Sequence, residues 1–148
     1  MQKVPLKDLE KLAEEVLARL PGNDAGAAIV ALSGDLGAGK TTFTQALARV
    51  LGVSETIQSP TYVLMRSYAL HRTGDNTRFD TLIHIDAYRL ESAEEFNALK
   101  PETFLNNPKN LIVIEWPERV EATLPTPDLV LKFSSQDAEA GERYIELV

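Results

Sequence analysis

One octapeptide has the residue types and spacing of a phosphate-binding loop: Gly34-Asp35-Leu36-Gly37-Ala38-Gly39-Lys40-Thr41. It matches the pattern G-x-x-x-x-G-K-[ST] in full. The glycines let the backbone turn so that its N–H groups point inward and closely approach phosphate oxygens. Lys40 can reach the β- and γ-phosphates of a nucleotide, and the Thr41 hydroxyl can bind Mg²⁺. The loop therefore predicts a nucleoside triphosphate site.

Such a site needs an acidic partner for Mg²⁺, usually at the carboxyl end of a buried strand beside the loop. Glu115 directly follows the apolar run 111–114, and Asp86 ends the run 82–85. We favour Glu115 as the metal ligand, directly or through water. Asp86 then becomes the residue that orients or deprotonates the attacking water, or that binds a metal-bound water. The alternative is that either residue is only a solvated acid at a strand end.

Three further side chains are candidates near this site. His84 shares a strand face with Asp86 by the period of two, although a lone strand histidine is commonly a hydrogen-bonded structural residue. Pro117 predicts extended backbone for Trp116, whose ring would cover the nucleotide, anchor a partner or simply pack. Thr61, in the turn 59–61, could direct its hydroxyl towards the γ-phosphate.

The elements around the loop follow the order that the motif needs. Residues 28–32 form an apolar run of strand length, and residues 42–51 have apolar side chains at helical spacing. The start of that helix would add unpaired N–H groups and the positive end of its dipole. Residues 6–20 predict an amphipathic covering helix. The alternative for its first residues is contact with the base of the nucleotide.

The remaining patterns predict a mixed sheet. Strands over 62–70 and 79–85 are separated by a polar stretch, which favours an antiparallel hairpin. A helix over 91–99 would begin at Ser92, with Glu95 placed for a capping box, and residues 101–106 predict another helical turn or two. The run 111–114 suits a central strand, and strands over 129–133 and 143–148 would close the sheet as a terminal hairpin. We therefore predict an α/β, P-loop NTPase-like fold in one domain over residues 1–148, with a mixed parallel and antiparallel sheet flanked by helices.

Composition narrows the function further. The 148 residues include 44% hydrophobic and 25% charged residues, as in an ordinary globular protein. A net charge of −7 argues against a nucleic-acid binder that works alone. The chain has no cysteine, which excludes thiolate chemistry and cysteine metal sites. No apolar run approaches the length of a membrane span, so we expect a cytoplasmic protein.

Four motifs follow one another along the chain: Gly34-Asp35-Leu36-Gly37-Ala38-Gly39-Lys40-Thr41-Thr42-Phe43, Ser59-Pro60-Thr61-Tyr62, His84-Ile85-Asp86-Ala87-Tyr88-Arg89-Leu90 and Ile114-Glu115-Trp116-Pro117. In this order they resemble the successive motifs of the bacterial TsaE (YjeE) family. The resemblance covers most of the chain and is weakest in the first twenty and last fifteen residues.

The resemblance implies a small P-loop ATPase that binds ATP and Mg²⁺ and hydrolyses ATP slowly. It would serve threonylcarbamoyl modification of the adenosine beside the anticodon in certain tRNAs, docking on TsaB and TsaD and meeting tRNA only through that complex. By motif, Gly37, Ala38, Gly39, Lys40, Thr41 and Thr42 would hold the phosphates. Thr41 and Glu115 would hold the metal, Asp86 with Lys40 would serve hydrolysis, and Trp116 would lie near the nucleotide or the partner.

Two other functions remain open from the sequence. A small-molecule kinase would need a mobile lid that supplies arginines to the transferred phosphoryl group, whereas the arginines here are scattered. A nucleotide-dependent binding switch without significant catalysis would change the turn 59–61 and the Asp86 loop with the γ-phosphate. The sequence does not separate such a switch from an ATPase that serves an assembly.

Overall fold

The computed structural model describes residues 2–22, 25–35, 38–53, 55, 64–71, 76, 78–134 and 142–147. Gly37 and the turn 59–61, with Thr61, lie outside these residues. The elements in chain order are β1 (Gln2–Pro5), η1 (Leu6–Asp8), α1 (Leu9–Arg19), β2 (Ala28–Gly34), α2 (Lys40–Val50), β3 (Met65–Ala69), β4 (Thr81–Asp86), α3 (Ala93–Asn97), α4 (Glu102–Leu105), β5 (Asn110–Glu115), η2 (Pro117–Arg119), β6 (Leu129–Ser134) and β7 (Glu142–Leu147).

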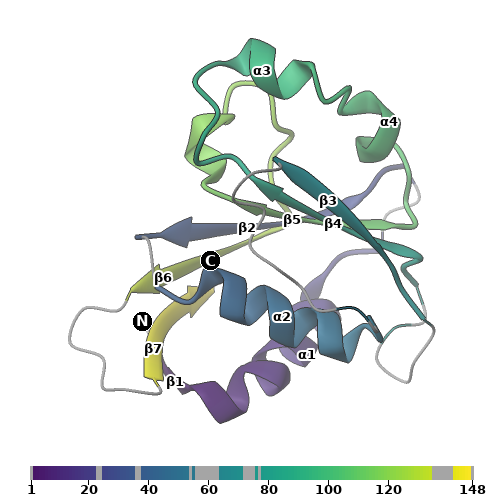
Figure 1. The fold of residues 1–148 in the computed structure, drawn as a ribbon. Coiled ribbons are helices and arrows are strands. Elements are labelled where there is room, and N and C mark those ends of the chain that lie inside the picture. The colour runs from purple at the N-terminus through teal and green to yellow at the C-terminus, as the bar shows by residue number, and fades with distance from the viewer. Residues whose placement is uncertain are drawn as a thin grey trace.

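The described strands form one seven-stranded sheet in the order β1-β7-β6-β2-β5-β4-β3 (Figure 1). The four inner neighbours β6, β2, β5 and β4 are parallel, whereas β3, β7 and β1 pair antiparallel at the two edges. The predicted mixed α/β architecture is therefore confirmed, together with both predicted hairpins. Every residue of β5 is buried, as expected for a central strand covered on both faces.

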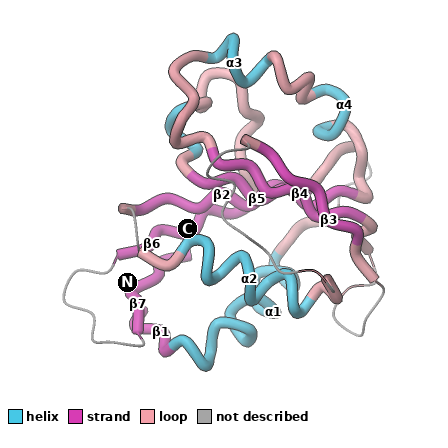
Figure 2. The backbone as a smooth tube through the Cα atoms, viewed as in Figure 1, coloured by secondary structure: helices cyan, strands magenta, loops and turns pink. Residues whose placement is uncertain are grey.

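Helices cover the two faces of the sheet (Figures 1 and 2). On one face, α1 and α2 bury Val16 and Phe43 in a core that includes Val30 and Leu32 of β2. On the other face, α3 and α4 contribute Phe96 and Phe104 to a second core, which includes Ala31 of β2. Alternate residues of β2 thus serve the two cores, because successive side chains of a strand point to opposite faces.

Local interactions explain several boundaries. Ser92 caps α3, where its hydroxyl accepts a 3.4 Å hydrogen bond from the Glu95 amide. The Glu95 carboxylate accepts from the amide of Glu91 and not from that of Ser92, so the reciprocal half of the expected capping box is shifted by one residue. At the N-terminus, residues 6–8 form a 3-10 turn before α1, and Leu6 is exposed rather than part of the apolar helix face.

The sheet also contains a strand that the sequence patterns did not predict. β1 pairs antiparallel with β7 and forms the outer edge beside the terminal hairpin. Within the described ranges, no helix is long and apolar enough to cross a membrane.

Candidate functional site

The site lies where β2, β5 and β4 end side by side. In the register of these parallel strands, Leu32 lies beside Glu115, and Glu115 lies beside Asp86. The carboxyl ends of parallel strands are the usual position of ligand sites in such sheets. Glu115 and Asp86, the two acids predicted from the sequence, therefore lie side by side at the carboxyl ends of their strands, although 29 positions separate them in the numbering.

The loop between β2 and α2 begins and ends with glycines in unusual backbone conformations. Gly34 has φ +137°, and a Cβ atom there would collide with the backbone carbonyl of Phe133. Gly39 has φ 106° and is the N-cap of α2. Between them, the amide of Ala38 donates a 3.1 Å hydrogen bond to the Asp35 carbonyl. Only glycine adopts these positive φ angles without strain, so the loop geometry depends on both glycines.

Lys40 is the first residue of α2, and its side chain turns back over the loop. Its Nζ donates to the carbonyl oxygens of Gly34 and, at 2.9 Å, Asp35. The same Nζ lies 4.4 Å from the centre of the Trp116 ring, within the range of a cation–π interaction. Lys40 is 5% exposed. Its ammonium group is thus held at the loop by groups that a phosphate could replace.

Burial lowers the pKa of Lys40, while the charges of Glu115, Asp86, Glu118 and Asp35 act in the opposite direction. Burial likewise raises the pKa of Asp86, and the charge of Glu115 adds to this effect. The Asp86 carboxylate accepts a 3.0 Å hydrogen bond from the Tyr88 amide, which opposes the increase. The charge of Glu115 therefore acts on both Lys40 and Asp86 at the strand ends, and the charges of Lys40 and Asp86 act on each other.

Glu115 is fixed by a buried contact with a histidine. Glu115 is 4% exposed, His84 is fully buried, and His84 Nε2 lies 2.6 Å from Glu115 Oε2. An ionised carboxylate only accepts hydrogen bonds, so the N–H group at Nε2 of the His84 ring is the donor to Glu115. Nδ1 of the same ring is buried without a hydrogen-bond partner among the described residues. His84 is therefore a hydrogen-bonded residue, as is common for a lone histidine on a strand, and its partner is Glu115, the predicted metal ligand.

The backbone of Trp116 corrects one prediction. Instead of the extended conformation expected before Pro117, Trp116 adopts a left-handed conformation with φ 60° and ψ 52°. Its amide donates a 3.1 Å hydrogen bond to the Leu32 carbonyl, which holds the residue against β2 as the chain leaves the sheet. The Trp116 ring packs on Tyr88 with centroids 4.9 Å apart, and the Arg119 guanidinium lies 5.5 Å from the Tyr88 ring.

Two more of the predicted phosphate and metal ligands lie at the start of α2. Thr41 and Thr42 lie in the first turn of α2, where Thr41 is half-buried and Thr42 is exposed. Sequence reasoning missed Tyr88, Glu118 and Arg119 as neighbours of the site. Tyr88 belongs to the motif 84–90, but its contact with Trp116 depends on how β4 and β5 end together.

Mg²⁺ and ATP each place a chemical requirement on the residues around the loop. Among the described residues, no group of three or more His, Cys, Asp or Glu side chains forms a protein-only metal cage. Mg²⁺ usually takes one or two protein ligands and completes its shell with phosphates and waters. One hydroxyl and one carboxylate, from Thr41 and Glu115, fit that requirement. A buried lysine that contacts the carbonyls of a glycine loop likewise fits a triphosphate, whose charge would offset the cost of burying the ammonium group.

Comparisons with known proteins agree with this architecture. The family model described as "Threonylcarbamoyl adenosine biosynthesis protein TsaE" matches residues 5–145. A Haemophilus influenzae protein named tRNA threonylcarbamoyladenosine biosynthesis protein TsaE is 33% identical over 134 residues, covering 90% of this chain and 77% of that protein. A Bacillus subtilis protein of the same name is 35% identical over 124 residues, covering 78% and 72%.

A solved structure is also similar. The crystal structure of Bacillus subtilis YdiB superimposes with a TM-score of 0.60 at 26% identity, covering 97% of this chain and 80% of that chain. The family match spans the loop, both acids and Trp116. The chain belongs to the TsaE family.

Proposed function

We propose that this chain binds Mg²⁺–ATP at the loop 34–41 and hydrolyses it slowly, in support of threonylcarbamoyl modification of the adenosine beside the tRNA anticodon. In this proposal it acts with TsaB and TsaD and meets tRNA only through them. The observation that carries the ATPase proposal is the meeting of Lys40, Glu115 and Asp86 at one sheet edge, next to the loop that precedes α2. Family membership supports the pathway.

In binding, Lys40 would exchange the carbonyls of Gly34 and Asp35 for the β- and γ-phosphate oxygens. The loop amides of residues 37–39 and the first turn of α2, with Thr42, would supply further donors. Thr41 and Glu115 would hold Mg²⁺, which neutralises charge that develops on the phosphates when it is bound. His84 would fix the Glu115 carboxylate, since it already occupies one of its oxygens.

In this proposal Asp86 acts on the attacking water. It lies beside Glu115 in the sheet register, and its carboxylate is aligned by the Tyr88 amide. We assign it to orienting the attacking water or a metal-bound water. Trp116 would cover the nucleotide from the side of η2, and Thr61 would approach the γ-phosphate from the turn 59–61.

A switch without significant catalysis is the second candidate. The left-handed Trp116 favours it, because a non-glycine residue in this conformation is held by its surroundings, and such strain is typical of switch regions. Equal affinity for TsaB–TsaD with ADP and with a non-hydrolysable ATP analogue would exclude this candidate. No contact among the described residues favours a small-molecule kinase.

The proposal is tested by measuring ATP hydrolysis by the purified chain, with and without TsaB and TsaD of the same organism. We expect slow turnover alone, faster turnover with both partners, and loss of at least about tenfold in Asp86→Asn. Brisk turnover that ignores the partners would contradict the proposed role. A pull-down with TsaB and TsaD, in ATP and in ADP, tests the partnership separately.

A further inference from the structure

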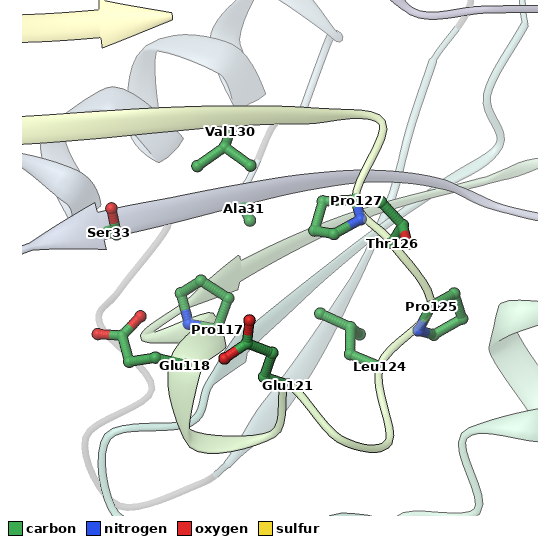
Figure 3. Close-up of a pocket in the computed structure, with 10 residues that line it drawn as sticks. All are labelled: Ala31, Ser33, Pro117, Glu118, Glu121, Leu124, Pro125, Thr126, Pro127 and Val130. Carbon is green, nitrogen blue, oxygen red and sulfur yellow. The ribbon is translucent and has the colours of Figure 1, made fainter. Parts of the chain in front are cut away.

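A cavity of about 340 Å³ lies beside the proposed nucleotide site, on the opposite face of the sheet from α2 (Figure 3). Ala31 of β2 and Val130 of β6 form one side, and both belong to the second core or pack against it. The segment 117–127 forms the other side. The proposed phosphate site borders the first core, so the cavity is separate from it.

The chemistry of the walls combines apolar surface with negative charge. Leu124, Val130 and three prolines supply apolar surface, while the carboxyl groups of Glu118 and Glu121 lie on the segment below the strands (Figure 3). Both glutamates are exposed, and no lysine or arginine is among the described residues that line the cavity. These carboxylates would repel phosphates, so the cavity does not suit a nucleotide or nucleic acid.

We propose that this cavity is the docking site for an extended segment of a partner protein, which places an aliphatic side chain beside a lysine or arginine. The aliphatic group would contact Leu124 and Val130, and the cation would pair with Glu121. The net charge of −7 also favours association with a basic partner. The prolines lack amide donors, so recognition would rest on shape, apolar contact and charge.

The cavity is linked to the proposed nucleotide site through the short helix η2. η2 forms part of the cavity wall and begins directly after Trp116, whose ring lies over Lys40. Glu118 is close enough for its charge to act on Lys40. Tyr88 contacts both the Trp116 ring and Arg119 of η2.

An occupant that presses on Pro117 and Glu118 would therefore act on the turn that holds Trp116 over Lys40. Docking would in this way change the nucleotide site without entering it. This coupling, and the use of TsaB–TsaD as the binding partner in its test, rest on the proposed function.

The test measures the affinity of the full chain for purified TsaB–TsaD, with the variants Glu121→Lys and Leu124→Ala. We expect each variant to weaken binding by about tenfold while it stays folded and its basal ATP hydrolysis stays at the wild-type value; the melting temperature should be unchanged in Glu121→Lys and modestly lower in Leu124→Ala, which loses packing against the second core. Glu14→Lys is the matched control, because it makes the same charge change at an exposed position of α1, which packs against the other face of the sheet. Its affinity should stay within twofold of wild type. The wild-type affinity should also fall with added NaCl more steeply than that of Glu121→Lys.

Contrary outcomes are distinct. Wild-type binding that neither cavity variant weakens would overturn the docking proposal alone. Failure of the wild type to bind TsaB–TsaD in any nucleotide state would remove the proposed partnership, and this inference with it. A dimer of this chain that Glu121→Lys dissociates would assign the cavity to a second copy and also overturn the proposal.

Discussion

The buried contact between His84 and Glu115 yields a prediction that needs no ligand. In His84→Ala, Glu115 loses its donor at a position where it is 4% exposed. A hydrogen bond to a charged group contributes about 1.5–3 kcal/mol, and leaving a buried carboxylate without its partner costs roughly 3–5 kcal/mol. We therefore expect His84→Ala to lower the free energy of unfolding by about 3–5 kcal/mol.

A double-mutant cycle separates the contact from the loss of packing. The free energy of unfolding is measured by urea denaturation for His84→Ala, Glu115→Ala and the double variant. The expected coupling energy is about 1.5–3 kcal/mol, with the sign that makes each substitution less destabilising when the other is already present. His71→Ala is the control: His71 is the other histidine of the chain and is exposed, so its replacement should cost less than about 0.5 kcal/mol.

The same pair has a functional consequence under the proposed function. If His84 fixes the metal-binding carboxylate, folded His84→Ala should need about 10–100-fold more Mg²⁺ for half-maximal hydrolysis, as is usual when a residue that orients a ligand is lost. Coupling below about 0.5 kcal/mol, or an unchanged Mg²⁺ requirement, would refute the assignment of His84 as the residue that positions Glu115.

Three further predictions concern the loop, the second acid and a helix cap. Gly34→Ala should destabilise the fold by roughly 2–6 kcal/mol in urea denaturation, because it combines a positive φ with a collision against Phe133. Gly22→Ala is the control: no atom lies near its new methyl group, so it should change stability by less than about 1 kcal/mol in either direction. Equal effects of the two substitutions would contradict this account of the loop. Burial raises the pKa of Asp86, so the folded state binds a proton at this carboxyl more tightly than the unfolded state does. The free energy of unfolding of the wild type should therefore fall relative to that of Asp86→Asn as pH rises from about 4 through the raised pKa. A difference in the free energy of unfolding between the two proteins that is constant over pH 3–8 would exclude this effect. Ser92→Ala should cost about 0.5–1 kcal/mol through loss of the α3 cap, and no measurable loss would mean that the 3.4 Å contact is not stabilising.

The parts of the fold that the sequence predicted are those with a local pattern. Hydrophobic periodicity or turn residues indicate the local structure of three parts of the chain. These are the glycine loop with its flanking strand and helix, the buried run 111–114, and both hairpins. β1 has four residues and ends in Pro5, so it has no comparable pattern. It exists because β7 offers an edge to pair with, which is a tertiary effect.

The candidate site divides in the same way. Residue type and position at a strand end were enough to propose Glu115 and Asp86. The contact between His84 and Glu115 depends on β4 and β5 being parallel neighbours in one register, which a single sequence does not specify. The prediction for Trp116 was wrong because the following proline disfavours only the right-handed helical region, and the hydrogen bond to Leu32 selects the left-handed one.

The most direct test of the central claim uses the fluorescence of Trp116, the only tryptophan of the chain. Since Lys40 lies over this ring and would move to the phosphates, titration with ATP in Mg²⁺ should give a saturable change in emission. Lys40→Ala, verified as folded by circular dichroism, should give no such change at the same concentrations. Absence of any Mg²⁺–ATP response in the wild type, or an equal response in Lys40→Ala, would contradict the assignment of this loop as an ATP site.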